Sequence, residues 1–125
     1  MFLSPVTVLI VEDEGLLCEL MVGELETLGF IVFKAQTAEE ALTLMEGEKP
    51  VDVLFTDIRL PGALDGIDLA RYVKEHHPTV RVLLASAHMP RSELPENLAE
   101  LIDKPYRSAN VLRAIQNLLD NKRGS

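Results

Sequence analysis

Short apolar runs alternate with helix-like stretches along the chain, and this alternation constrains the fold more than any other feature. The apolar runs are residues 6–11, 30–33, 51–56, 80–85 and 101–102. The helix-like stretches are residues 17–28, 38–45, 66–76 and 111–119. Near-continuous apolar runs indicate strands buried on both faces, and apolar residues at three- and four-residue spacing indicate helices packed on one side. The pattern predicts an α/β fold with a parallel sheet and helices on both faces.

The stretch at residues 90–99 interrupts this pattern. Pro90 and Pro95 leave room only for a short or distorted helix there. The chain has 125 residues and is 47% hydrophobic, which fits one domain over residues 1–125 with a core at about 6–120. The sequence breaks off soon after the last helical stretch, so an effector domain that follows residue 125 is the alternative.

Composition argues against several classes of function. A net charge of −8 disfavours nucleic-acid binding, which needs a basic face. The chain lacks an apolar run of the length that a membrane span needs, and residues 1–5 do not resemble a signal peptide. A single cysteine, Cys18, fits a reducing compartment. We therefore expect a cytoplasmic protein that binds neither membranes nor nucleic acid.

Polar residues follow four of the five predicted strands at the point where each strand ends. They are Glu12 and Asp13, Asp57, Ser86, and Lys104. In parallel α/β sheets ligands bind outside the carboxyl ends of the strands, so these side chains are expected to meet in one place. Each alone has an ordinary explanation, such as a helix cap or a solvated charge. Their joint occurrence at strand ends favours a functional site.

These residue types suit phosphoryl transfer at a magnesium ion. Two like charges ~5 Å apart repel by roughly 3 kcal/mol at an effective dielectric constant of about 20, and a hard divalent cation removes this penalty. Asp57 can act as the nucleophile, and Glu12 and Asp13 can hold Mg²⁺ directly or through water. Lys104 can neutralise a phosphoryl oxygen, and the Ser86 hydroxyl can donate a hydrogen bond to another.

The order and spacing of these motifs resemble the receiver domain of two-component response regulators, of which the chemotaxis regulator is a familiar type. The matching dipeptides are Glu12-Asp13, Thr56-Asp57, Leu60-Pro61, Asp65-Gly66, Ser86-Ala87 and Lys104-Pro105. The resemblance covers residues 6–120. It implies a doubly wound, flavodoxin-like sheet of five strands in the order 2-1-3-4-5, flanked by five helices.

The resemblance also implies a function and a set of site residues. Asp57 would accept a phosphoryl group from a histidine kinase or histidine phosphotransfer protein. Mg²⁺ would be held by Asp13, Asp57 and the backbone carbonyl of Arg59, and the Lys104-Pro105 bond would be cis. The side chains of Arg59 and His88 would tune phosphate hydrolysis. The protein would catalyse only its own phosphorylation and dephosphorylation and would switch a protein contact, including a possible homodimer.

Three features depart from the family pattern. The stretch at residues 61–66 is one residue longer than usual, which suggests a local bulge that leaves the site intact. Leu101 stands where the family has an aromatic residue, so the usual aromatic switch is in doubt, and Tyr106 is the nearest aromatic side chain. Pro90 and Pro95 suggest that the output surface, with Leu101 and Tyr106 as candidates, is rebuilt or mobile.

Two other functions compete with this interpretation. A pseudo-receiver that binds partners without phosphorylation is weakly favoured by Leu101 and disfavoured by the complete set of polar site residues. A haloacid-dehalogenase-like phosphohydrolase would need a second aspartate two residues after Asp57, where this chain has Arg59.

Overall fold

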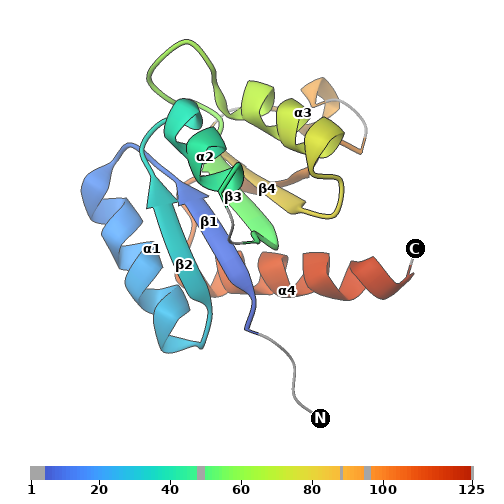
Figure 1. Cartoon of the computed structure of the whole chain (residues 1–125). Helices are drawn as coiled ribbons and strands as arrows, with labels where there is room; N and C mark the ends of the chain where they lie inside the picture. The colour runs from blue at the N-terminus through green and yellow to red at the C-terminus, as the bar shows by residue number, and fades with distance from the viewer. Residues whose placement is uncertain (1–4, 48–49, 88, 95–96, 125) are drawn as a thin grey trace.

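The sheet is parallel throughout and has five strands in the order β2-β1-β3-β4-β5. The computed structural model describes residues 5–47, 50–87, 89–94 and 97–124 (Figure 1). The strands are β1 (Thr7–Val11), β2 (Ile31–Ala35), β3 (Val53–Asp57), β4 (Arg81–Ser86) and β5 (Glu100–Asp103). The predicted sheet and strand order are confirmed. No helix in the described part of the chain is long and apolar enough to cross a bilayer.

Four α-helices in the described residues cover both faces of the sheet (Figure 1). They are α1 (Gly15–Thr27), α2 (Ala38–Met45), α3 (Gly66–His76) and α4 (Ser108–Gly124). Successive residues of β1 point to opposite faces, as strand geometry requires. Leu9 belongs to the core under α2 and α3, whereas Val8 belongs to the core under α1 and α4. The sheet is therefore buried on both sides, which explains the near-continuous apolar runs.

The expectation of five helices is wrong for the described residues. The connection between β4 and β5 contains only a short 3₁₀-helix, η1 (Arg91–Glu93). Pro90 can precede a helical turn, but a proline at position 95 has no backbone N–H to continue one. The core on this side is instead closed by Leu98 and Leu101, which are 7% and 5% exposed.

Local signals fix where the helices next to the site begin. Thr37 accepts a hydrogen bond from the Glu40 amide, 3.0 Å, and so caps α2. At α3, the Asp65 carboxylate accepts from the Asp68 amide, 2.9 Å, and the Asp68 carboxylate accepts from the Asp65 amide, 3.0 Å. In the lengthened loop before this cap, Gly62 has φ +99°, a conformation that side chains rarely adopt.

Candidate functional site

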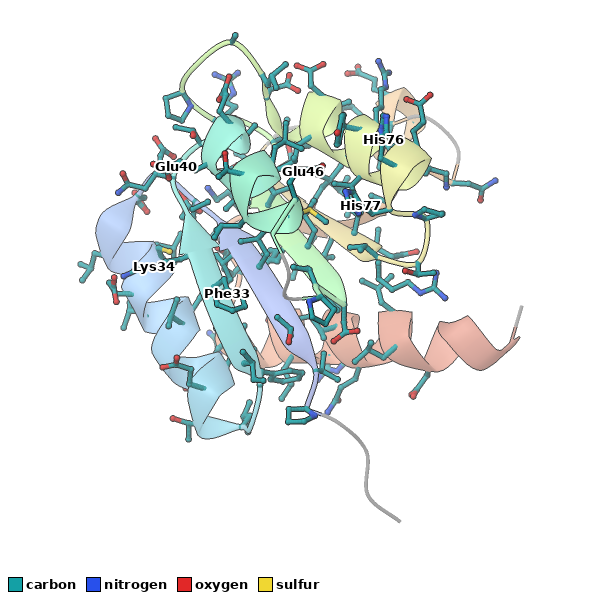
Figure 2. All side chains as sticks on the ribbon, in the orientation of Figure 1. Phe33, Lys34, Glu40, Glu46, His76 and His77 are labelled. Atoms are coloured by element: carbon teal, nitrogen blue, oxygen red, sulfur yellow. The ribbon has the colours of Figure 1, made fainter. Side chains whose placement is uncertain are left out.

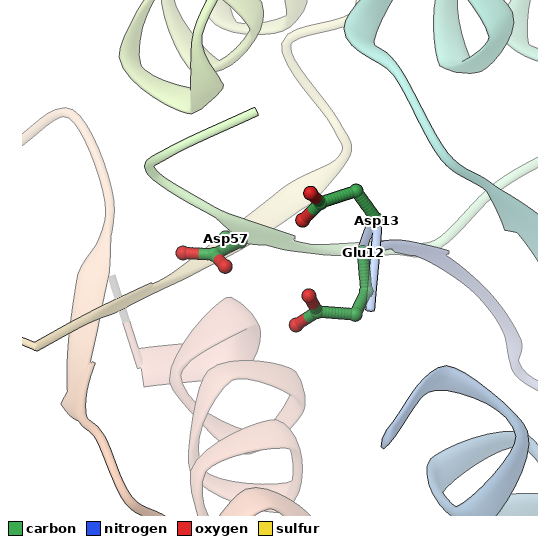
Figure 3. A group of neighbouring side chains, drawn as sticks. All are labelled: Glu12, Asp13 and Asp57. Atoms are coloured by element: carbon green, nitrogen blue, oxygen red, sulfur yellow. The ribbon is translucent and has the colours of Figure 1, made fainter. Parts of the chain in front are cut away.

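The three carboxylates predicted to meet at the sheet edge do so. Glu12 and Asp13 follow β1, and Asp57 is the last residue of β3. One carboxylate oxygen from each of them lies within 4.8 Å of the others, and Figure 3 shows the side chains converging from the two strand ends. Glu12 is 4% exposed and Asp57 is 9% exposed, while Asp13 is exposed. Such a cluster of hard oxygen ligands, open on one side, suits Mg²⁺.

Lys104 supplies the positive charge nearest to this cluster. Its Nζ lies 2.8 Å from Asp57 Oδ2 and 3.8 Å from Glu12 Oε1. The backbone amide of Lys104 donates to the Ser86 carbonyl, 2.9 Å, which fixes the loop after β5 against the end of β4. The Lys104-Pro105 peptide bond is cis. The lysine side chain is 25% exposed, so it is screened from water on most sides and pairs strongly with Asp57.

Backbone amides hold the carboxylates in place. The Arg59 amide donates to Asp57 Oδ1, 3.3 Å, so both Asp57 oxygens have a donor. The Glu14 amide donates to Glu12 Oε2, 3.1 Å. The backbone directly after Asp57 is also fixed, because the Gly66 amide at the start of α3 donates to the Ile58 carbonyl, 2.7 Å.

Burial sets the ionisation of the buried acid and its lysine partner. Desolvation raises the pKa of Glu12 above its ordinary value, opposed by the Glu14 amide and by the charge of Lys104. Burial lowers the pKa of Lys104, but the hydrogen bond and charge of Asp57 outweigh it and raise that pKa overall. The ammonium is therefore firmly charged, and Glu12 is a carboxylate that gains from a nearby cation.

A cavity of about 610 Å³ opens beside Asp57. Its lining includes Arg59, Ser86, Glu93 and Lys104. The Ser86 side chain is buried, and its Oγ accepts a hydrogen bond from the Met89 amide, 2.9 Å. The space is large enough for a phosphoryl group and for a side chain that delivers it. Sequence patterns gave no reason to place Glu93 here, because it reaches the cavity only through η1.

The remaining predicted residues lie outside the carboxylate cluster. Leu101 is buried in the core below α3 and lines neither this cavity nor the next. The Tyr106 ring packs edge-on against Phe55, with ring centroids 5.5 Å apart, and burial raises its pKa. Tyr106 lines a second cavity, of about 480 Å³, between the start of α1 and the Lys104-Pro105 loop. His88 lies outside the described residues.

The fold and this edge of the sheet together define the class of protein. A doubly wound five-stranded sheet with an acidic cluster and a lysine at its carboxyl edge is a receiver-type signalling domain. The family model of the response regulator receiver domain matches residues 8–116, and the chain belongs to this family. It is thus a receiver domain of two-component signalling. Receiver domains bind Mg²⁺ at an acidic pocket and take phosphoryl groups from histidine kinases.

Individual relatives agree with the family assignment. The chain is 30% identical over 121 residues to the nitrogen assimilation regulatory protein NtrX of Azorhizobium caulinodans, covering 93% of this chain and 26% of NtrX. The chain spans about a quarter to a half of the length of the first curated relatives that it matches.

Solved structures agree in the same way. A receiver domain protein of Methanospirillum hungatei matches with TM-score 0.86 and 26% identity, covering 97% of this chain and 98% of that one. The response regulator TrrA of Thermotoga maritima, solved in complex with Mg(2+)-BeF, matches with TM-score 0.79 and 27% identity, covering 90% and 98%.

Proposed function

We propose that this domain is a phosphorylation switch in which Asp57 accepts a phosphoryl group with Mg²⁺ bound at the acidic cluster. The observation that carries this proposal is the position of Asp57. Its carboxylate lies within 4.8 Å of those of Glu12 and Asp13, 2.8 Å from the Lys104 ammonium, and at the wall of an open cavity. The donor is the phosphohistidine of a histidine kinase or histidine phosphotransfer protein.

Each residue of the site has its own role in the phosphoryl transfer. An Asp57 oxygen forms the new bond to phosphorus as the bond from phosphorus to the donor imidazole nitrogen breaks, and that electron pair stays on the nitrogen. The Arg59 amide and Lys104 orient the two carboxylate oxygens before attack. Lys104 then balances the charge of the phosphoryl oxygens, and the Ser86 hydroxyl turns from Met89 to donate to one of them.

The donor set of this edge fits a bound Mg²⁺. The carboxylates of Glu12, Asp13 and Asp57, with the backbone carbonyl of Arg59, are the oxygens that would hold it directly or through water. When bound, the ion neutralises charge on the transferring phosphoryl group. The cost of burying Glu12 as an anion, seen in its raised pKa, favours binding of a cation here.

The output of the switch is a protein contact. Phosphorylation adds up to two negative charges beside Lys104 and Ser86, and the loops after β3, β4 and β5 respond. Residues 1–125 act as a single cytoplasmic receiver unit. Its partners are the phosphodonor and a protein target, with a homodimer as one form of that contact. Arg59 and His88 set the lifetime of the phosphate.

Intact-mass measurement after incubation with Mg²⁺ and acetyl phosphate tests the proposal. One phosphoryl adduct is expected, stable in acid and labile in base. It should disappear in Asp57→Asn and without metal. Asp103→Asn, which removes an exposed carboxylate from the same edge of the sheet, is the matched control and should be labelled like the wild type.

A failure to phosphorylate the protein would support the pseudo-receiver alternative. If neither acetyl phosphate nor a phosphorylated histidine kinase labels the protein, the phosphoryl switch is wrong. If Asp57→Asn is labelled as fully as the wild type, the domain is phosphorylated at another residue and the assignment of Asp57 is wrong.

A further inference from the structure

The end of the sheet opposite the acidic cluster contains buried polar atoms without partners. In the described part of the chain, two buried side-chain nitrogen or oxygen atoms lack a hydrogen-bond partner: His77 Nε2 and Arg81 Nε. His77 lies in the connection from α3 to β4, and Arg81 is the first residue of β4. Buried polar groups in proteins are almost always paired, so each such atom needs an explanation.

His77 has an acidic neighbour, whereas Arg81 has none. The His77 Nε2 atom lies 3.5 Å from Glu46 Oε2, and Figure 2 shows His77, directly after α3, near Glu46 at the end of α2. No ion pair or hydrogen bond joins the Arg81 guanidinium to another side chain within the described ranges. The Asp52 carboxylate, next to Arg81 in the fold, instead accepts from the Thr7 amide, 2.8 Å.

Arg81 lines a cavity of about 230 Å³ between α3, the starts of β4 and β5, and α4. Lys74, in the last turn of α3, lines the same cavity, and its ammonium donates to the Asn97 carbonyl. One part of the wall is apolar and includes Val82, Leu98 and Leu118. Among the described lining residues the one acid is Glu100, and it is exposed at the surface. Two cations against one exposed acid make this cavity positive in a chain of net charge −8.

We propose that this cavity binds a small aliphatic carboxylate. The carboxylate would accept hydrogen bonds from the part of the Arg81 guanidinium that lines the cavity and from the Lys74 ammonium. A planar guanidinium matches a carboxylate in two parallel hydrogen bonds, and a partly buried pair of this kind is stronger than an exposed one. A short alkyl group would lie against Val82 and Leu98.

Size and lining favour this ligand over other anions. The volume is below the range of pockets that bind drug-sized molecules, which excludes a nucleotide. Inorganic phosphate would leave the Val82 and Leu98 side chains in contact with water, whereas an alkyl group covers them. The cavity lies at the amino ends of β4 and β5, away from Asp57 at the carboxyl end of β3, so this inference is independent of the proposed phosphorylation.

The test is a titration of the ¹⁵N-labelled protein with sodium butyrate, followed by amide chemical shifts at constant ionic strength and without Mg²⁺. Saturable shifts are expected around residues 74, 81–82 and 98, with a dissociation constant on the order of 1 mM. Butyramide, which keeps the alkyl group but lacks the charge, should bind at least roughly ten-fold more weakly. Phosphate at the same concentrations should not produce the same shifts.

Matched variants test whether Arg81 and Lys74 bind the butyrate carboxylate. Arg81→Gln and Lys74→Gln should each weaken butyrate binding by roughly ten-fold or more. Arg71→Gln, which removes an exposed charge from the same helix outside the cavity, should leave binding unchanged. Lys74 is exposed, so Lys74→Gln keeps the test available if Arg81→Gln does not fold.

Three results would overturn the inference. The first is the absence of saturable shifts at these residues with butyrate. The second is equal binding of butyrate and butyramide, or of butyrate and phosphate. The third is a folded Lys74→Gln or Arg81→Gln variant that binds butyrate as tightly as the wild type.

Discussion

Gly66→Ala is expected to destabilise the domain at the point where α3 meets the phosphorylation site. A Cβ atom at Gly66 would lie 2.2 Å from the Asp57 carbonyl oxygen and 2.8 Å from the Ile58 Cα atom. Both are backbone atoms at the end of a buried strand, so neither can rotate away. Non-bonded atoms of this kind are ordinarily about 3.5 Å apart, so α3 would have to move by roughly 1 Å. This shift would strain the 2.7 Å hydrogen bond from the Gly66 amide to the Ile58 carbonyl.

The expected cost is about 3 kcal/mol in the free energy of unfolding, at the upper end for overpacking, and about 10 °C in the melting temperature. Urea denaturation followed by circular dichroism measures it. Gly23→Ala is the matched control, because Gly23 lies within α1 with no atom near the added methyl group, and it should stabilise by about 0.5–1 kcal/mol. A Gly66→Ala protein within about 1 kcal/mol of the wild type would refute the argument that contact with the Asp57 backbone requires glycine.

Other predictions follow from the charges and the core. Lys104→Met should lower the free energy of unfolding near pH 7 by about 1–3 kcal/mol, because Glu12 and Asp57 lose their cation. In thermal melts, added Mg²⁺ should restore much of the lost stability of this variant. Burial raises the pKa of Glu12 above 4.5, so the folded state holds this proton more tightly than the unfolded state does. The Glu12 contribution to stability therefore falls as pH rises from its ordinary pKa through the raised one, and Mg²⁺ should raise the melting temperature more at about pH 7.5 than at about pH 5. An equal gain at both pH values would contradict this. Leu101→Ala should lower the free energy of unfolding, measured in urea, by about 2–5 kcal/mol, because the Leu101 side chain is only 5% exposed. Intact-mass measurement should still show that Asp57 of this variant is phosphorylated. A variant as stable as the wild type would show that Leu101 does not support the core.

The sheet could be predicted from the sequence because its strands are buried on both faces. The run predicted at residues 6–11 corresponds to β1 at Thr7–Val11, and the run at 80–85 corresponds to β4 at Arg81–Ser86. Strand ends in a parallel sheet share one edge, so Asp57 and the Glu12-Asp13 pair could be brought together without knowing any distance. Thr37 is a residue type that favours the start of a helix, and its side chain caps α2 by local chemistry alone.

The rest depends on tertiary contacts that no local pattern records. The effect of Gly66 requires knowing that α3 starts against the Asp57 backbone, and Asp65-Gly66 alone gives no sign of this contact. The place of Glu93 at the cavity depends on how η1 replaces a full helix. The two prolines indicated a distorted segment, but not that a helix would be missing among the described residues.

Lys104 is the residue through which a charge change at Asp57 is expected to reach the rest of the domain. Its ammonium contacts Asp57, its backbone amide bonds to Ser86, and Tyr106, two residues later, packs against Phe55 and lines the cavity beside α1. The Leu101 side chain is a hydrocarbon and has no hydroxyl or other polar group that could follow the Ser86 hydroxyl when it turns toward a phosphoryl group. A structural response at residues 104–106 and the start of α1 therefore follows more directly from these contacts than one at Leu101.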